Sequence, residues 1–212
     1  MLFILTIPLL FHVCNCFLLV DQTPRNITKQ LTVSNGGTFG TWGLKQFCPD
    51  GEFAIGYDIK VESYQYTGDD TSLNAIRLIC SDIKGSPSAE KPVTSAVGDW
   101  GDWQGRATCN QRPGVNLFLK AFSLQVEPPQ GSGDDTAVNW AKFQCRDMEG
   151  NTPLEELNKL PGHGQFGSFG NWSDSCTTGS AICGMRTLVE AFQSDGDDTA
   201  LNDAIFYCCQ EA

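Results

Sequence analysis

The chain contains little histidine and few basic residues. Its 212 residues include 2 histidines, and 14 Lys and Arg stand against 25 Asp and Glu, which gives a formal net charge of −11 at pH 7. Nucleic acids and anionic membrane surfaces are bound through basic patches, so this charge argues against both as partners. Only His163 follows the first 16 residues. A Ser-His-Asp triad or a zinc site is therefore not expected, and no phosphate-binding loop or dinucleotide fingerprint points to a cofactor.

Long hydrophobic runs are also scarce. Residues 1–16 carry no charged side chain and are dominated by Leu, Ile, Phe and Val, which is typical of a secretory signal peptide. A membrane anchor is the alternative, but the run is too short to span a bilayer and polar sequence follows it. We therefore expect a secreted, extracellular protein without a membrane span. Its signal peptide would be 1–16, followed by an N-terminal segment, 17–37.

One motif occurs three times with the same internal spacing. Each copy consists of Val-Glu, five residues, Gly-Asp-Asp-Thr, two residues, Asn, five residues and Cys, and the copies begin at Val61, Val126 and Val189. A repeat of this period indicates one supersecondary unit used three times. Each unit opens with a glycine-aromatic segment. The three openers are Phe39-Gly40-Thr41-Trp42, Trp100-Gly101-Asp102-Trp103 and Phe169-Gly170-Asn171-Trp172.

Apolar residues alternate with polar ones on both sides of each motif. In the first copy Tyr57, Ile59 and Val61 precede the motif on one face, and Ile76 and Leu78 follow it on one face. Period two with one apolar side predicts half-buried strands and an all-β fold. The best helix candidate is the short stretch 154–160. Three small sheets, none able to bury its apolar face alone, should pack around a shared axis.

Eight cysteines follow the signal peptide, an even number in a chain expected to enter an oxidising compartment. They predict four disulfides rather than a metal site or a redox pair. The expected bridges are Cys48–Cys80 and Cys109–Cys145, with Cys176 and Cys183 bonded to Cys208 and Cys209 in an order that the spacing leaves open. Two sequons make Asn26 and Asn171 candidate glycosylation sites.

The repeated elements resemble the vitelline membrane outer layer protein I family. The Gly-Asp-Asp-Thr-x-x-Asn elements, the Gly-x-Trp openers and the three-fold period carry the resemblance from Thr38 to Cys209. It implies a β-prism of three antiparallel Greek-key sheets with pseudo-three-fold symmetry, stapled by disulfides. The domain would span 38–212, with repeats at roughly 38–80, 98–145 and 165–209. One departure is that Phe39 and Phe169 stand where the second repeat has Trp100.

The resemblance also implies an extracellular location and a link to carbohydrates. Family members belong to extracellular coats such as the outer layer of egg envelopes, and have been linked to synthesis of N-acetyl-chito-oligosaccharides. The prism is shared with some plant lectins. The implied partners are extracellular matrix or coat proteins and glycans.

The acidic elements are candidate catalytic groups, because glycoside chemistry needs two carboxylates about 5–10 Å apart. The candidates are Glu62, Asp69, Asp70, Glu127, Asp134, Asp135, Glu190, Asp197 and Asp198. Three copies of one turn favour a structural role instead, since Gly supplies positive φ and Asp and Thr side chains bond nearby main chain. The Asn of each motif should be buried against its turn, and each Glu should point away from that Asn. No catalytic residue is assigned, and calcium would require six to eight converging oxygens that the sequence does not show.

The aromatic openers are expected to pack mainly in the core. Trp100 and Trp103, beside Asp99 and Asp102, are the candidate carbohydrate-binding exceptions. We therefore expect a structural or carbohydrate-interacting component of an extracellular matrix or egg-type coat. The alternatives are an N-acetyl-chito-oligosaccharide transferase or hydrolase acting through carboxylates, and a lectin-like module without catalysis.

Overall fold

The computed structural model describes residues 25–65, 71–131, 136–193 and 199–211, and every regular element in these ranges is a strand. Three hairpins, each made of two ten-residue strands, form its frame. They are β4 (Glu52–Val61) with β5 (Leu73–Asp82), β9 (Leu117–Val126) with β10 (Val138–Asp147), and β13 (Ser180–Val189) with β14 (Leu201–Gln210). The short strands are β1 (Ile27–Leu31), β2 (Thr41–Trp42), β3 (Gln46–Phe47), β6 (Val93–Thr94), β7 (Asp102–Trp103), β8 (Ala107–Thr108), β11 (Glu155–Asn158) and β12 (Ser168–Phe169).

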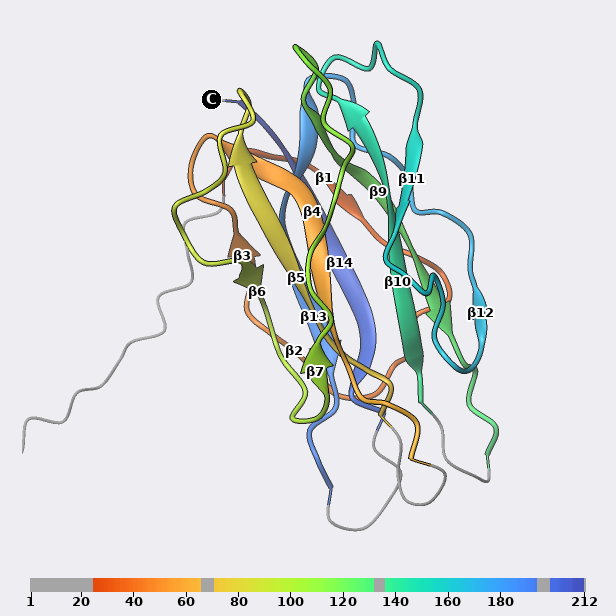
Figure 1. Ribbon diagram of the computed structural model, residues 1–212. Helices are drawn as coiled ribbons and strands as arrows, with labels where there is room; N and C mark the ends of the chain where they lie inside the picture. Colours follow the sequence, from red (N-terminus) through yellow and green to blue (C-terminus); the bar gives the residue numbers. More distant parts are fainter. Residues whose placement is uncertain (1–24, 66–70, 132–135, 194–198, 212) are drawn as a thin grey trace, which may run out of the picture.

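The strands form three antiparallel sheets that run side by side along the molecule (Figure 1). Their strand orders are β6-β5-β4-β7, β11-β10-β9-β12 and β1-β14-β13-β2, with β8 added on β4 and β3 on β13. In the first two sheets the strand that comes fourth along the chain pairs with the strand that comes first, as β7 does with β4. This is the Greek-key order. The third sheet has the same order, completed by β1 and β2 from the other end of the chain. The protein is thus an all-β prism, as predicted.

Each sheet combines segments from two sequence repeats, which the repeat pattern alone did not indicate. The opener of one repeat pairs with the hairpin of the repeat before it: β7 with β4, and β12 with β9. The first opener, β2, pairs with β13 of the last repeat, and β1 pairs with β14. Unpaired edges of a hairpin take up the next available strand. Strand β1 lies within the segment 17–37, before the predicted start of the domain.

The core lies along the prism axis, where the apolar faces of the hairpins meet. The expected alternation is confirmed, since Tyr57, Ile59, Ile76 and Leu78 belong to one buried cluster with all their counterparts except Thr187, which is buried but polar. The rings of Phe122, Phe143 and Phe206, one from each of three different strands, pack with centroids 4.6–6.3 Å apart. Burial of this shared face stabilises all three sheets together, because none covers its own face alone.

The helix candidate 154–160 is wrong. Residues Glu155–Asn158 form strand β11, which pairs with β10 from Lys142↔Asn158 to Cys145↔Glu155. The exposed edge of β10 offers unpaired main-chain groups, and satisfying them outweighs the weak helical pattern of a short segment. Asn158 Oδ1 also accepts a hydrogen bond from Trp140 Nε1 at 3.1 Å.

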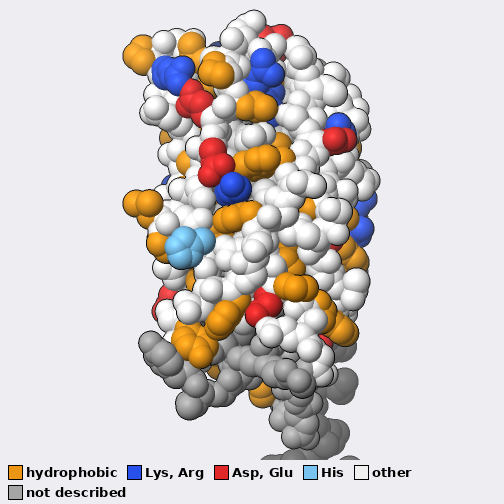
Figure 2. Space-filling view, turned by 90° about the vertical axis from the view of Figure 1, so that its right-hand side faces the viewer, with side chains coloured by type: hydrophobic (Ala, Val, Ile, Leu, Met, Phe, Trp, Pro, Cys, Tyr) orange, Lys and Arg blue, Asp and Glu red, His pale blue; other side chains and the backbone are white. Residues whose placement is uncertain are grey.

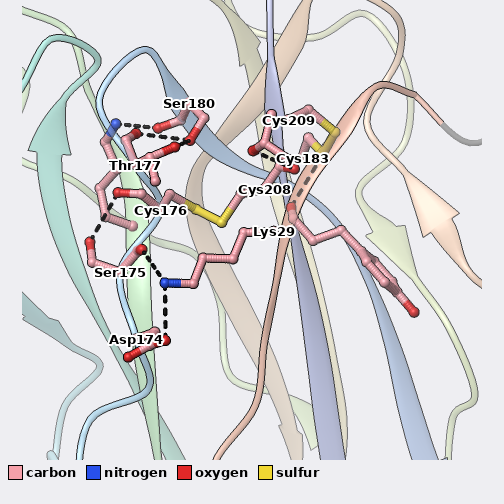
Figure 3. Close-up of a disulfide and its surroundings, with 12 residues drawn as sticks. Lys29, Asp174, Ser175, Cys176, Thr177, Ser180, Cys183, Cys208 and Cys209 are labelled. Atoms are coloured by element: carbon pink, nitrogen blue, oxygen red, sulfur yellow. Dashed lines mark hydrogen bonds and ion pairs between the residues drawn. A yellow bond between two sulfur atoms is a disulfide. The ribbon is translucent and has the colours of Figure 1, made fainter.

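The four expected disulfides are present. Three of them, Cys48–Cys80, Cys109–Cys145 and Cys176–Cys208, each join the loop that follows an opener to the second strand of a hairpin in the next sheet. Together they link all three sheets in a ring. The fourth, Cys183–Cys209, bonds β13 to β14 within one sheet. Figure 3 shows these last two bridges side by side, with Lys29 of β1 reaching Asp174 at 3.0 Å.

Candidate functional site

The described residues that flank the three repeated turns lie at one end of the prism (Figure 1), and they make the same chain of hydrogen bonds in each copy. Glu62 Oε2 accepts from the main-chain N–H and the hydroxyl of Thr71, at 3.1 and 2.6 Å. Asn74 Nδ2 donates to that same Thr71 hydroxyl at 2.7 Å, and Gln65 Nε2 donates to Glu62 Oε1. The equivalent groups in the other turns are Glu127, Thr136, Asn139 and Gln130, and Glu190, Thr199, Asn202 and Gln193.

This network holds an unusual backbone conformation. The residue after each threonine has positive φ without being glycine: Ser72 at 51°, Ala137 at 45° and Ala200 at 46°. Such residues cost free energy and persist where their surroundings hold them in place. Each motif asparagine donates to the carbonyl of that strained residue at 3.3 Å. The glutamate, threonine and asparagine therefore stabilise the turn in all three copies.

The predicted burial of Asn74, Asn139 and Asn202 is confirmed, since each is fully buried. The expectation that each glutamate points away from its asparagine is wrong, because both side chains bond the same threonine hydroxyl. Glu62 pairs with Ser72 across the hairpin, through a hydrogen bond from the Glu62 N–H to the Ser72 carbonyl at 2.8 Å, and this pairing brings the carboxylate beside Thr71. The six aspartate candidates, Asp69, Asp70, Asp134, Asp135, Asp197 and Asp198, lie outside the described residues.

The third opener is three residues earlier than predicted. Gly40, Gly101 and Gly167 have φ of 96°, 78° and 72° and pack so closely on Val189, Val61 and Val126 that a Cβ would collide with their main chain. The third opener is therefore Phe166-Gly167-Ser168-Phe169. The segment contains two Phe-Gly dipeptides, and only the contact with the preceding hairpin distinguishes them. The first aromatics are thus Phe39, Trp100 and Phe166.

The second aromatic of each opener is covered by a cation from its sheet. Arg77 lies 4.1 Å above the Trp103 ring, Arg186 lies 4.6 Å above Trp42, and Lys142 lies 4.6 Å above Phe169. Such contacts stabilise by about 0.5–2 kcal/mol each. The ring face of Trp103, one of the two candidate carbohydrate-binding residues, is therefore occupied by Arg77.

The first aromatic residue of an opener lies at the boundary with the neighbouring sheet. In two of the three copies it contacts an aromatic side chain of that sheet, two positions after the motif glutamate. Trp100 packs edge-to-face on Phe192 at 5.9 Å, and Phe166 on Tyr64 at 5.5 Å. We call these two contacts the closed seams. Trp100, the other candidate, is 45% exposed and Phe192 is 58% exposed, so these rings also face solvent.

At the third seam the arrangement is different. The residue two positions after Glu127 is Pro129, where the other copies have Tyr64 and Phe192. Between Phe39 and Pro129 lies a pocket of about 760 Å³, which we call the open seam. Its lining comprises Asn35, Gly36, Gly37, Thr38, Phe39, Val126, Glu127, Pro128, Pro129, Gly131, Ala137, Gly167, Ser168, Gly170, Glu190, Thr199 and Asn202. Figure 2 shows hydrophobic side chains over the whole height of one face, some of them beside the grey atoms.

Two buried acceptors in residues that line the open seam, Asn35 Oδ1 and Asn202 Oδ1, have no hydrogen-bond partner among the described residues. The amide oxygens of Asn74 and Asn139 accept hydrogen bonds from the opener N–H groups of Trp100 and Phe166, at 3.1 and 3.0 Å. Asn202 Oδ1 has no hydrogen-bond partner, although the residue is fully buried. The third copy is therefore incomplete on the side that faces the pocket.

The described lining carries negative charge and no positive charge. It contains Glu127 and Glu190, and no Lys or Arg among the described residues. One carboxyl near its wall has a raised pKa: burial raises the pKa of Asp203, against which Gly36 packs, to about 6. Asp203 itself is not among the described lining residues. Within the described ranges, no group of three His, Cys, Asp or Glu could hold a metal ion, and no helix could cross a membrane.

The sequence did not identify the open seam or the residues Tyr64, Phe166 and Phe192. A signal for two of them exists in the repeats, because an aromatic stands two residues after the motif glutamate in the first and third copies and proline in the second. The partners of these residues come from other repeats. Their pairing therefore depends on how the sheets are arranged around the axis.

These features define a disulfide-linked β-prism protein with three copies of one hydrogen-bonded motif and a pocket of about 760 Å³ at one of its three seams. The chain belongs to the family described as vitelline membrane outer layer protein I, whose model matches residues 29–211. It is 42% identical over 187 residues to the human vitelline membrane outer layer protein 1 homolog, covering 86% of this chain and 84% of that protein. The mouse homolog is 42% identical over 179 residues, covering 84% and 81%.

Among solved structures, the fold is similar to Calystegia sepium agglutinin with a TM-score of 0.48 and 13% identity. The match covers 89% of this chain and 99% of the agglutinin. The V. cholerae biofilm matrix protein Bap1 matches with a TM-score of 0.35 and 8% identity, over 86% of this chain and 26% of Bap1.

Proposed function

We propose that the protein is a secreted component of an extracellular coat or matrix, of the vitelline membrane outer layer kind, and that it binds glycans at the open seam. The observation that carries the binding proposal is the pocket itself, which lies between the exposed ring of Phe39 and Pro129 at one end of the prism. Its volume falls within the roughly 300–1,000 Å³ typical of ligand sites. The family membership and the names of the relatives support the coat assignment.

The chemistry of the lining suits a sugar ring. Phe39, Pro128 and Pro129 offer apolar surfaces for the C–H faces of a ring, while Glu127 and Glu190 offer acceptors for its hydroxyl groups. A mostly apolar site with few polar groups that fix orientation is the usual design of a small-ligand pocket. Trp100 remains a proposed second sugar contact, because its ring is partly exposed. Trp103 is a weaker one because Arg77 covers it.

Secretion and glycosylation are part of the same proposal. The signal peptide, 1–16, lies outside the described residues, and the four disulfides suit an oxidising compartment. Asn26 and Asn171 are exposed in their sequons, so both are accessible to a glycan. We propose one structural domain over 38–212, to which β1 from the segment 17–37 adds an edge strand.

A glycan-active enzyme is the second candidate function. Glu127 and Glu190, from different repeats, line the same pocket, and glycoside chemistry requires two carboxylates. Each of these carboxylates is also held by a glutamine and a threonine that maintain a turn. Glu62 makes the same contacts at a closed seam, so these contacts serve the repeated turn and are not specific to the pocket. We therefore favour glycan binding without turnover.

The test is to incubate purified protein with an N-acetylglucosamine tetramer, measure binding by titration calorimetry, and resolve chain lengths by mass spectrometry. Binding with an unchanged tetramer is the expected result. New chain lengths, lost in the Glu127→Gln variant, would establish the enzyme instead. A complete absence of both binding and turnover would contradict the glycan proposal.

A further inference from the structure

We infer that the prism has one ligand site because a single position, Pro129, leaves one of three equivalent seams open, and that this site takes an uncharged sugar ring. This inference rests on the proposed function and deepens it. It assigns the stoichiometry, the charge class of the ligand and the residue that decides access. None of these three properties follows from the repeat pattern, which predicts three equivalent seams.

The comparison among the three seams carries the stoichiometry. At two of them an opener aromatic meets an aromatic two residues after the motif glutamate, as in Trp100 with Phe192 and Phe166 with Tyr64. At the third, Phe39 is 52% exposed and lines the pocket opposite Pro129. An aromatic side chain buries about 150–250 Å², so replacing it with proline leaves space for a ligand ring in its position.

The unpartnered acceptor supports the same conclusion independently. A buried amide oxygen without a donor costs about 1–3 kcal/mol, and native proteins rarely leave one. Asn202 Oδ1 lacks the opener N–H that Asn74 and Asn139 receive, and Asn202 lines the open seam. The first opener therefore does not seal its seam with the hydrogen bond that the other two openers make.

The charge of the lining selects against anions. Glu127 and Glu190 lie in the lining, and the described lining residues include no Lys or Arg. A ligand carboxylate or sulfate would meet like charge without a compensating cation, which costs affinity. The same reasoning disfavours a fatty acid, although the walls are largely apolar. A neutral ring that presents donors and C–H faces satisfies both the polar and the apolar parts of the lining.

The decisive variant is Pro129→Phe, which restores at the third seam the side chain found at the other two. We expect at least tenfold weaker binding of the N-acetylglucosamine tetramer by titration calorimetry, with unchanged thermal unfolding. Thr38→Trp fills the pocket from the opposite wall and should have the same effect. It provides the test should Pro129→Phe fail to fold. Leu154→Phe is the matched control, because it adds the same aromatic ring at an exposed position outside the pocket lining and should bind within about twofold of the parent protein.

The ligand class is tested with two further probes on the unmodified protein, tetragalacturonate and laurate. We expect one tetramer bound per chain and no competition from either anion. If the parent protein binds the tetramer and Pro129→Phe and Thr38→Trp bind it equally well, the open seam is not the site and the inference is overturned. Two or three tetramers per chain, or displacement of the tetramer by either anion, would also overturn it. If the parent protein binds no tetramer, the proposed function itself fails.

Discussion

At the scale of single residues, the threonine hydroxyl at each turn has two roles. Thr71 donates to Glu62 and accepts from Asn74, and all of its counterparts make the same pair of contacts. The hydroxyl is the link between a partly exposed carboxylate and a fully buried amide. Its position next to a residue with positive φ explains why the turn tolerates that conformation in three places.

We predict that Thr71→Val destabilises the fold by about 1–3 kcal/mol, because the shape is kept while the buried Asn74 amide loses the closer of its two acceptors. The free energy of unfolding in guanidinium chloride measures the effect. Thr71→Ser, which keeps the hydroxyl, should cost less than half as much. Equal losses for the two variants would show that packing, and not the hydroxyl, holds the turn.

Asp203 predicts a pH dependence. Burial raises its pKa from 3.8 to about 6, partly opposed by the hydrogen bond from the Ala204 N–H. The folded state therefore favours the protonated form, and this contribution to stability is fully present below pH 3.8 and lost as pH rises through about 6. Asp203→Asn should be more stable than the parent at pH 7.5, and the difference should shrink toward pH 4.

Thermal unfolding between pH 4 and 8 checks this expectation. The exposed Asp102→Asn change serves as the control and should leave the pH profile unaltered. A parent protein that gains stability as pH rises from 4 to 6, with Asp203→Asn showing no difference, would contradict the assignment.

At the scale of elements, a buried lysine joins two sheets. Lys120 of β9 is 2% exposed and donates to the main-chain carbonyls of Met148 and of Ser180 in β13. Burial lowers its pKa to about 8. Taking a charge out of water is costly, and hydrophobic residues of similar volume often replace buried charges without loss.

Lys120→Met should accordingly be neutral or stabilising at pH 7, whereas Lys120→Ala should cost about 2–5 kcal/mol through the space it leaves. Because the folded-state pKa is below the ordinary 10.5, the parent should gain stability as pH rises from about 8 to 10.5. The methionine variant should lack that gain. Denaturant unfolding of the three proteins at pH 7 and pH 9.5 provides the measurement.

At the scale of the whole molecule, the disulfides and the sheet pairings close the same ring. Each inter-sheet bridge joins two sheets, and the first opener and β1 complete the third Greek key beside the last hairpin. Replacing both Cys48 and Cys80 with Ala should cost about 2–5 kcal/mol, since the bridge closes a loop of 32 residues.

The matched variant replaces both Cys183 and Cys209, which close a loop of 26 residues within one sheet. Loop length alone predicts nearly equal losses for the two pairs. We expect the inter-sheet pair to cost more, because it also holds neighbouring sheets together. Equal free energies of unfolding would show that chain entropy accounts for both.

Much of the fold could be predicted from the sequence because the relevant signals are local. Alternation around Ile76 and Leu78 identified the inward face, and an even cysteine count in matching places predicted the bridges. The third opener was misplaced because Phe166-Gly167 and Phe169-Gly170 are locally equivalent. The glutamate orientation was wrong because it depends on the pairing of each glutamate with the residue after the motif threonine across the hairpin, which alternation does not encode.

The sequence by itself determined the three-fold repetition, the all-β class and the set of bridged cysteines, since spacing and period are properties of the chain alone. Only the tertiary structure decided that each opener joins the preceding hairpin, that Tyr64 and Phe192 each close a seam, and that Pro129 leaves one open. These outcomes depend on contacts between residues far apart along the chain, which form only when three sheets meet around one axis.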